Sequence, residues 1–185
     1  MNKQNLKIAI ILLFLFIADR FVKIVILNKV ETGFKPVSTL FSSFINKPEI
    51  NSGIALSLPL NNTLAIVISV IAIVIITWHL SSLLKYKTWP ASLSRKPALG
   101  LGRRGELVFY WGLIIIGAFG NLLDRIAYQG VVDYLSLPLI PSLFNPSDAF
   151  IFIGAILLAL NTRLYSTLSI GQSLAGLKDK QDSSK

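Results

Sequence analysis

Residues 120–136, GNLLDRIAYQGVVDYLS, decide how the chain is interpreted. A long apolar run ends there in Asn121, Asp124 and Arg125, and a second aspartate, Asp133, follows nine residues after Asp124 inside another apolar patch. Charged side chains are costly in or beside a bilayer, so carboxylates placed at the end of a hydrophobic helix are functional candidates. What these carboxylates do depends on where the helix lies.

The composition of the chain is typical of a membrane protein. Its 185 residues are 53% hydrophobic and their mean hydropathy is +0.65, whereas soluble domains are about 45–50% apolar. The chain contains no cysteine and a single histidine, His79, which excludes disulfides, thiol nucleophiles and zinc sites built from cysteine or several histidines. We therefore expect no metal and no cofactor, and any chemistry must use carboxylates, hydroxyls, amides or lysines.

Four segments are apolar enough and long enough to cross a bilayer, which takes about 20 residues. They cover residues 6–27, 64–84, 107–123 and 149–164. The sequence therefore predicts an all-α membrane protein with four transmembrane helices. We expect a single transmembrane domain over residues 1–165 and a polar cytoplasmic tail over residues 166–185.

A small β-rich extracytoplasmic element is predicted between the first and second helices, at about residues 28–62. Its composition is of the β type, and it is too short to hold a hydrophobic core of its own. The residues that give it this composition are Phe34, Val37, Thr39, Leu40, Phe41, Phe44 and Ile45.

The positions of the basic residues predict the orientation of the helices through the positive-inside rule. One side carries Lys3, Lys7, Lys85, Lys87, Arg95, Lys96, Arg103, Arg104, Arg163, Lys178, Lys180 and Lys185, and the other carries Lys29, Lys35, Lys47 and Arg125. Both termini and the basic loop at about residues 85–105 are therefore expected in the cytoplasm. The net charge of +9 is interpreted in the same way, so we expect membrane lipids and no nucleic acid among the partners.

This orientation brings the polar residues of the helices to the outer side. Asp19 lies in the outer half of the first helix, Asp133 lies between the third and fourth helices, and Asn51 lies in the first outer loop. One stripe of the third helix, by i,i+3 and i,i+4 spacing, carries Gly117, Gly120, Asn121 and Asp124. Glycines in such a stripe allow another helix or a substrate to approach closely.

Several of these residues also have a structural explanation. Asn145 is typical of a helix N-cap, and Asp148 in the first turn of the fourth helix favours the helix dipole. Asp124 can end the third helix at the membrane interface, and we expect its carboxylate to orient Arg125 and the following connection.

The remaining two acids differ in how easily they are explained. Asp19 and Lys23 are four residues apart on one helix and can neutralise each other inside the bilayer. Asp133 lies in an apolar interfacial stretch with no neighbouring base. A charge costs about 2.5–3.5 kcal/mol at the bilayer centre and less toward the interface. Asp133 is therefore a functional candidate.

Five short blocks of the chain, in order, resemble the motifs of lipoprotein signal peptidase, also called signal peptidase II. This family is a bacterial membrane aspartic peptidase with four transmembrane helices, which cleaves the signal peptide of prolipoproteins before a cysteine that carries diacylglycerol. The blocks are Asp19 with Lys23, Asn51-Ser52-Gly53-Ile54-Ala55, Gly117 to Arg125, Gly130 to Tyr134, and Phe144-Asn145 with Asp148.

The resemblance implies that residues 1–165 form a peptidase domain in which Asp133 and Asp148 are the catalytic pair. The residues that it implies as substrate-binding or supporting are Asp19, Lys23, Asn51, Gly53, Asn121, Asp124, Arg125 and Asn145. It further implies a diacylglyceryl prolipoprotein as substrate, inhibition by globomycin-type antibiotics, and a location in the bacterial cytoplasmic (inner) membrane.

The chain departs from the family pattern at three positions, none of which removes a carboxylate. Arg20 follows Asp19 where Gln is common, Leu56 stands where Phe is usual, and Ser147 stands where Ala is usual. These departures bear on substrate fit and catalytic efficiency.

The expected mechanism uses two aspartates that share a proton, one to activate water and one to hydrogen-bond the scissile carbonyl. Two alternatives remain open from the sequence. One is a serine–lysine peptidase that uses Ser52 or Ser57 with Lys23. The other is a small ion-coupled transporter with intramembrane carboxylates, although no inverted repeat is visible and the acids lie at one face. An inactive peptidase-like binding protein is a third possibility that no feature of the sequence favours.

Overall fold

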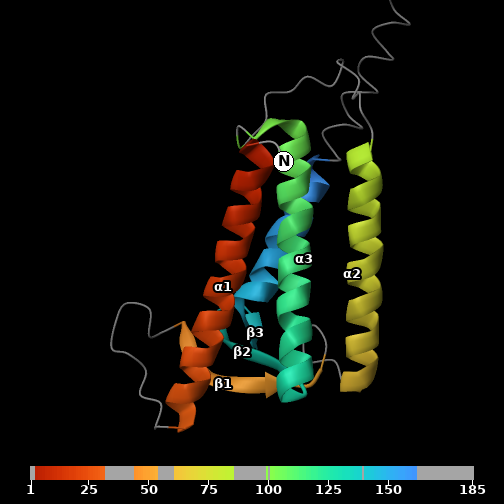
Figure 1. Cartoon of the computed structure of the whole chain (residues 1–185). Helices are drawn as coiled ribbons and strands as arrows, with labels where there is room; N and C mark the ends of the chain where they lie inside the picture. Colours follow the sequence, from red (N-terminus) through yellow and green to blue (C-terminus); the bar gives the residue numbers. More distant parts are fainter. Residues whose placement is uncertain are drawn as a thin grey trace, which may run out of the picture.

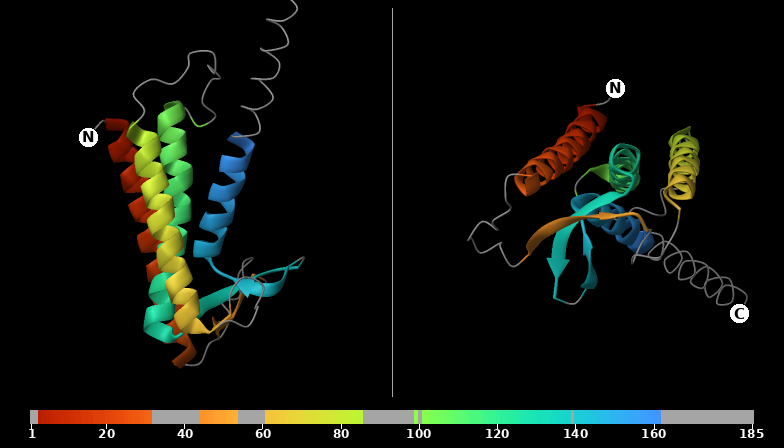
Figure 2. Two further views of the ribbon diagram at one scale, coloured as in Figure 1. Left: turned by 90° about the vertical axis from the view of Figure 1, so that its right-hand side faces the viewer. Right: turned by 90° about the horizontal axis from the view of Figure 1, so that it is seen from below.

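The computed structural model of the chain describes residues 3–31, 44–53, 61–85, 99, 101–138 and 140–161. Its helices are α1 (Lys3–Glu31), α2 (Asn62–Lys85), α3 (Gly102–Tyr128) and a further helix, Pro146–Asn161. They lie roughly alongside one another, and a small sheet closes one end of the bundle (Figures 1 and 2). The first three predicted apolar segments lie inside α1, α2 and α3, and the mainly helical architecture is confirmed.

Two of the described helices are long and apolar enough to cross a membrane, over Asn62–Ser82 and Arg104–Tyr128, and Pro146–Asn161 is apolar but shorter. The number of four spans therefore stays a prediction. Large apolar side chains of α2 are exposed, namely Leu64, Val67, Ile68, Val70, Ile71, Val74, Ile75 and Trp78. An exposed apolar face of this extent is typical of a helix that contacts lipid.

The sheet is antiparallel and has the order β1-β2-β3, with β1 at Ile45–Asn51, β2 at Val131–Leu137 and β3 at Ile140–Phe144. The expectation of a β-rich element confined to residues 28–62 is therefore wrong in part, because two of the three strands come from the connection after α3. Of the residues that gave residues 28–62 their β-type composition, those from Phe34 to Phe41 lie outside the described residues, as does the tail over 166–185.

Strand β2 was missed because residues 131–134 are all buried. Its sequence therefore lacks the alternation of polar and apolar residues that marks a strand with one wet face. The β-branched and aromatic residues of this stretch nevertheless suit a strand. In the register of β1 and β2, Glu49 faces Asp133 and Asn51 faces Val131.

Glycines of α3 admit the helix Pro146–Asn161. A Cβ atom on Gly117 would strike the carbonyl oxygen of Ser147, and one on Gly120 would strike the Ser147 hydroxyl. Farther along, a Cβ on Gly154 would lie 2.7 Å from the carbonyl oxygen of Tyr110. The sequence left open whether the glycine stripe of α3 faces another helix or a substrate. In the structure, the stripe packs against a helix.

We predict that Gly117→Ala lowers the stability of the purified protein by about 1–3 kcal/mol, because the added methyl group meets backbone that cannot move aside cheaply. Thermal unfolding in detergent measures this. Gly105→Ala is the matched control on the same helix, since its Cβ would meet no backbone but the ends of the Gln4 and Ile8 side chains, at 2.8 and 3.3 Å. Equal melting temperatures for the two variants would contradict the close packing of α3 on the helix Pro146–Asn161.

Candidate active site

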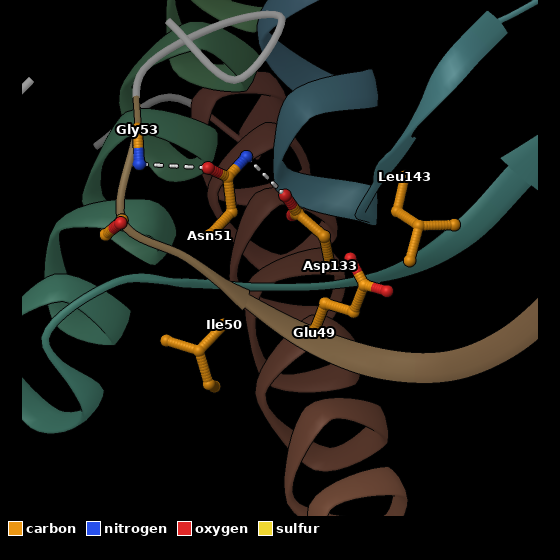
Figure 3. Close-up of a pocket in the computed structure, with 7 residues that line it drawn as sticks. Glu49, Ile50, Asn51, Gly53, Asp133 and Leu143 are labelled. Carbon is orange, nitrogen blue, oxygen red and sulfur yellow. Dashed lines mark hydrogen bonds between the residues drawn. The ribbon is translucent and has the colours of Figure 1, made fainter. Parts of the chain in front are cut away.

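Asp133 lies on β2 at the end of the bundle and is 3% exposed. Its Oδ1 accepts a hydrogen bond from Asn145 Nδ2 at 2.7 Å, and its Oδ2 accepts one from Asn51 Nδ2 at 3.0 Å. The Asn51 side chain is itself oriented, because its Oδ1 accepts the backbone N–H of Gly53 at 2.9 Å (Figure 3). Two amides from different segments therefore hold both oxygens of this carboxyl group.

The backbone around Asp133 is placed by the end of α3. The helix ends at Tyr128, and the C-cap residue Gln129 adopts a left-handed conformation with φ of 61°. Gly130 follows, and a Cβ there would lie 2.8 Å from the carbonyl oxygen of Asn51. The missing side chain lets β2 approach β1 and brings Asp133 within reach of Asn51.

Asp148 lies in the first turn of the helix Pro146–Asn161. Its Oδ2 accepts the backbone N–H of Asn145 at 3.2 Å, while Asn145 Oδ1 accepts the backbone N–H of Asp148 at 3.2 Å. This reciprocal pair is a capping box, so the helix-cap interpretation of both residues is correct. The other oxygen, Asp148 Oδ1, accepts a hydrogen bond from Asn121 Nδ2 of α3 at 2.6 Å.

Asn145 connects the two aspartates. Its side chain is fully buried, donates to Asp133 through Nδ2 and accepts from the Asp148 backbone through Oδ1. Its backbone N–H donates to the Asp148 carboxyl group. One residue therefore contacts both carboxyl groups and fixes their relation to each other.

Burial shifts the protonation of Asp133. Removal of the carboxyl group from water raises its pKa to about 6, although the hydrogen bonds from Asn145 and Asn51 lower it. The nearby charge of Asp148 raises the pKa further, and that of Lys23 lowers it. Asp133 can therefore exchange a proton near neutral pH, and its protonation depends on that of Asp148.

A second cluster of charges lies between α1 and α3. Lys23 Nζ lies 2.6 Å from Asp124 Oδ2 and 3.5 Å from Asp19 Oδ2. Arg20 contacts both acids as well, at 2.6 Å from Asp19 Oδ2 and 2.7 Å from Asp124 Oδ1. The predicted pairing of Asp19 with Lys23 is present, but it is part of a four-membered cluster in which Lys23 lies nearer to Asp124.

The expectation that Asp124 orients Arg125 and the following connection is wrong for Arg125, whereas the contact with the connection is present at Val132. The Asp124 carboxylate contacts Arg20, Lys23 and the backbone N–H of Val132, while Arg125 Nη2 donates to the carbonyl oxygen of Gly53 at 2.7 Å. Successive residues of an α-helix point about 100° apart, so neighbours in sequence face different partners. Arg125 thus anchors the turn at Asn51 to Gly53 instead.

A pocket of about 310 Å³ opens beside Asp133 (Figure 3). It is lined by Glu49, Ile50, Asn51, Ser52, Gly53, Asp133 and Leu143. Sequence reasoning missed Glu49, Ile50 and Leu143. Only the pairing of β1 with β2 places Glu49 opposite Asp133. Among the described residues, no group of three or more His, Asp or Glu side chains could hold a metal ion.

The structure brings the predicted site residues into two connected groups. One contains Asp133 and Asp148 with Asn51, Asn121 and Asn145, and the other contains Asp19, Lys23 and Asp124 with Arg20. Leu56 and Ser57 lie outside the described residues.

Comparison with known proteins identifies relatives along most of the chain. The sequence profile described as "Signal peptidase (SPase) II" matches residues 11–164. The lipoprotein signal peptidase of Pelagibacter ubique is 34% identical over 176 residues, covering 86% of this chain and 92% of that protein. With the lipoprotein signal peptidase of Halothermothrix orenii, the match is 50% identical but spans only 38% of that protein and 30% of this chain.

The fold has solved counterparts too. A bacterial membrane enzyme whose structure was determined by the in meso method at 2.3 Å superposes with a TM-score of 0.63 and 18% sequence identity, over 86% of this chain and 89% of that one. The profile match over most of the chain, together with the full-length similarity to the Pelagibacter protein, establishes that this chain belongs to the signal peptidase II family of aspartic-type peptidases.

Proposed function

We propose that the chain is a membrane aspartic endopeptidase that removes the signal peptide from diacylglyceryl-modified prolipoproteins at the outer face of the bacterial cytoplasmic membrane. The observation that carries this proposal is the Asn145 bridge, in which the side-chain amide donates to the Asp133 carboxyl group and the backbone N–H donates to the Asp148 carboxyl group. Its relatives are named lipoprotein signal peptidases, which supports the same class of substrate.

Asp133 and Asp148 act as a catalytic pair that shares one proton, because two adjacent carboxylates do not both ionise cheaply. The ionised member accepts a proton from a water molecule as the water oxygen attacks the scissile carbonyl carbon. The protonated member donates a hydrogen bond to the carbonyl oxygen. When the tetrahedral intermediate collapses, the C–N bond breaks and the leaving amine takes up a proton, so no covalent enzyme intermediate forms.

The three asparagines orient the pair. Asn51 and Asn145 donate to Asp133, and Asn121 donates to Asp148, so each carboxyl group presents a defined oxygen to the substrate. Arg125 acts indirectly, because its hydrogen bond to the Gly53 carbonyl oxygen holds the turn that carries Asn51. Orientation of this kind is worth several kcal/mol of barrier in enzymes generally.

The pocket beside Asp133 receives the peptide, and the lipid on the substrate cysteine stays in the outer leaflet. This arrangement is supported by the position of the sheet, which lies at one end of the helices (Figure 2). Two of these helices, α1 and α2, carry many exposed apolar side chains. A lipid anchor restricts the substrate to the membrane surface and thereby raises its local concentration at the site.

Four transmembrane helices place the sheet outside and both termini in the cytoplasm. In support, the start of α1 and the end of α2 lie at the opposite end of the bundle from the sheet (Figure 1). Lys3 and Lys7 belong to the start of α1 and Lys85 to the end of α2, which agrees with the positive-inside rule.

Cysteines introduced one at a time at Ser43 and Ser92 test this topology; both positions lie outside the described residues. In intact cells, a membrane-impermeant thiol reagent should label Ser43→Cys and not Ser92→Cys. Permeabilised cells should show labelling of both and serve as the control. Labelling of Ser92→Cys alone in intact cells would reverse the proposed orientation.

Asp133→Asn and Asp148→Asn should each abolish cleavage of a diacylglyceryl prolipoprotein by the purified protein in detergent, since the pair works as a unit. Both substitutions keep the shape of the side chain and remove the titrating proton, but each replaces one oxygen that accepts an N–H with an NH2 group. Cleavage is therefore compared per folded molecule. Asp182→Asn, in the C-terminal tail, is the control of equal charge change and should cleave normally. If Asp148 only caps its helix, its Asn variant loses about 0.3–1 kcal/mol of stability and remains active.

The same assay tests the substrate class. The parent protein should cleave the lipidated precursor and leave the unlipidated precursor largely intact. Equal rates on the two precursors would show that the lipid is not recognised, and no cleavage of either would refute the proposed function.

The pH dependence of cleavage should respond to Asn51. Its hydrogen bond favours the ionised form of Asp133, so Asn51→Ala should raise the pKa of that carboxyl. The limb of the pH–rate profile that belongs to Asp133 should therefore move to higher pH, by roughly one unit. Asn61→Ala, which removes the cap on the Thr63 backbone N–H at the start of α2, should leave the profile in place. A profile that moves to lower pH in Asn51→Ala would contradict the assigned role of this amide.

A further inference from the structure

The charged cluster between α1 and α3 contacts the residue that precedes each of the two proposed catalytic aspartates. Asp124 Oδ2 accepts the backbone N–H of Val132, next to Asp133, at 3.3 Å. Asp19 Oδ2 accepts the hydroxyl of Ser147, next to Asp148, at 2.9 Å. The position of each catalytic carboxyl group is therefore linked to one acid of the cluster.

Arg20 links the two acids to each other. Its Nε and Nη2 donate to Asp19 Oδ2 at 3.1 and 2.6 Å, and its Nη1 donates to Asp124 Oδ1 at 2.7 Å. A planar guanidinium can span two carboxylates in this way, whereas the compact ammonium group of a lysine cannot reproduce the fork. Both acid side chains are fully buried, and Arg20 is 20% exposed.

We infer that Arg20 and Ser147 act together as positioning residues that set the distance and orientation of Asp133 relative to Asp148. This inference rests on the proposed function. The two residues meet at one atom, Asp19 Oδ2, to which both donate.

This series of contacts explains why the effects of Arg20 and Ser147 depend on each other. Ser147 ties the start of the helix Pro146–Asn161 to Asp19, and Arg20 ties Asp19 to Asp124, which holds β2 at Val132. Lys23 Nζ also contacts both acids, at 2.6 Å from Asp124 Oδ2 and 3.5 Å from Asp19 Oδ2, so it still holds α1 to α3 when either donor is lost. Loss of either donor weakens the same connection between the two catalytic aspartates, and loss of the second donor adds little further displacement.

A purely structural role for Arg20 would give a different result. In that case its removal lowers the melting temperature and the folded fraction, while turnover per folded molecule stays the same. A positioning role lowers kcat per folded molecule and leaves KM nearly unchanged, because the pocket beside Asp133 that receives the peptide is intact. Turnover per folded molecule therefore separates the two roles.

The test is a double-mutant cycle with Arg20→Gln, Ser147→Ala and the double variant, assayed on a diacylglyceryl prolipoprotein and corrected for the folded fraction. Each single variant should lower kcat about tenfold with KM within about twofold, and the double variant should lose about as much as the worse single variant. Arg20→Lys retains the charge and should recover part of the loss. It also keeps the test decisive if Arg20→Gln fails to fold.

Two matched controls share the chemistry of the changes but lie away from the cluster. Lys7→Gln removes one positive charge from an exposed position of the same helix, and Ser81→Ala removes an exposed hydroxyl of α2 that bonds only within its own helix. Both should keep the kcat of the parent protein.

Single variants with kcat within twofold of the parent, or losses that multiply in the double variant, would overturn the inference. Neither result contradicts the proposed function. That function is supported as long as the parent protein cleaves the lipidated precursor and Asp133→Asn does not. A parent protein without activity would instead refute the proposed function itself.

Discussion

The fold depends on the mutual neutralisation of Asp19 and Asp124 by Arg20 and Lys23 between two apolar helices. A single unpaired charge in such surroundings would be strongly destabilising, since breaking a buried ion pair costs about 3–5 kcal/mol. Here two acids and two bases balance, and every one of the four takes part in at least two contacts. The cluster fixes α1 against α3, and the sheet and the helix Pro146–Asn161 are then attached to the same acids.

The residues that cap the helix Pro146–Asn161 are also those that build the proposed catalytic pair. The capping box between Asn145 and Asp148 satisfies backbone groups that a helix start leaves open. The same Asn145 side chain has a spare N–H, which it donates to Asp133. The structural and the catalytic interpretations of Asp148 thus describe one set of hydrogen bonds, and only the role of the titrating proton distinguishes them.

Sequence reasoning predicted the features that hydropathy and charge encode locally. The helices appear as apolar runs, and the outer placement of Asp19, Asp124, Asp133 and Asp148 followed from the distribution of lysine and arginine. The structure brings Asp19 and Asp124 together around Arg20, and Asn145 contacts both Asp133 and Asp148, while the outer placement of these residues stays a prediction. The membership in the signal peptidase II family, which five short motifs indicated, is confirmed as well.

Features that depend on contacts between distant segments were not predictable in the same way. Arg20 was noted only as a departure beside Asp19, whereas its partner Asp124 is 104 residues away in the sequence. Strand β2 was missed because it is buried on both faces, and Glu49 enters the pocket only through the register of β1 and β2. Asp124 was assigned to its neighbour Arg125, but the turn of the helix points the two side chains at different partners.

The most direct test of the coupled aspartate pair is a titration of the carboxyl carbons by NMR, with ¹³C-labelled aspartate in the detergent-solubilised protein. We expect the Asp133 carboxyl to titrate with a pKa of about 6. In Asp148→Asn, where the neighbouring negative charge is absent, this pKa should fall. An Asp133 carboxyl that titrates at the ordinary value of 3.8, or one whose pKa is the same in the parent protein and in Asp148→Asn, would contradict the coupled pair.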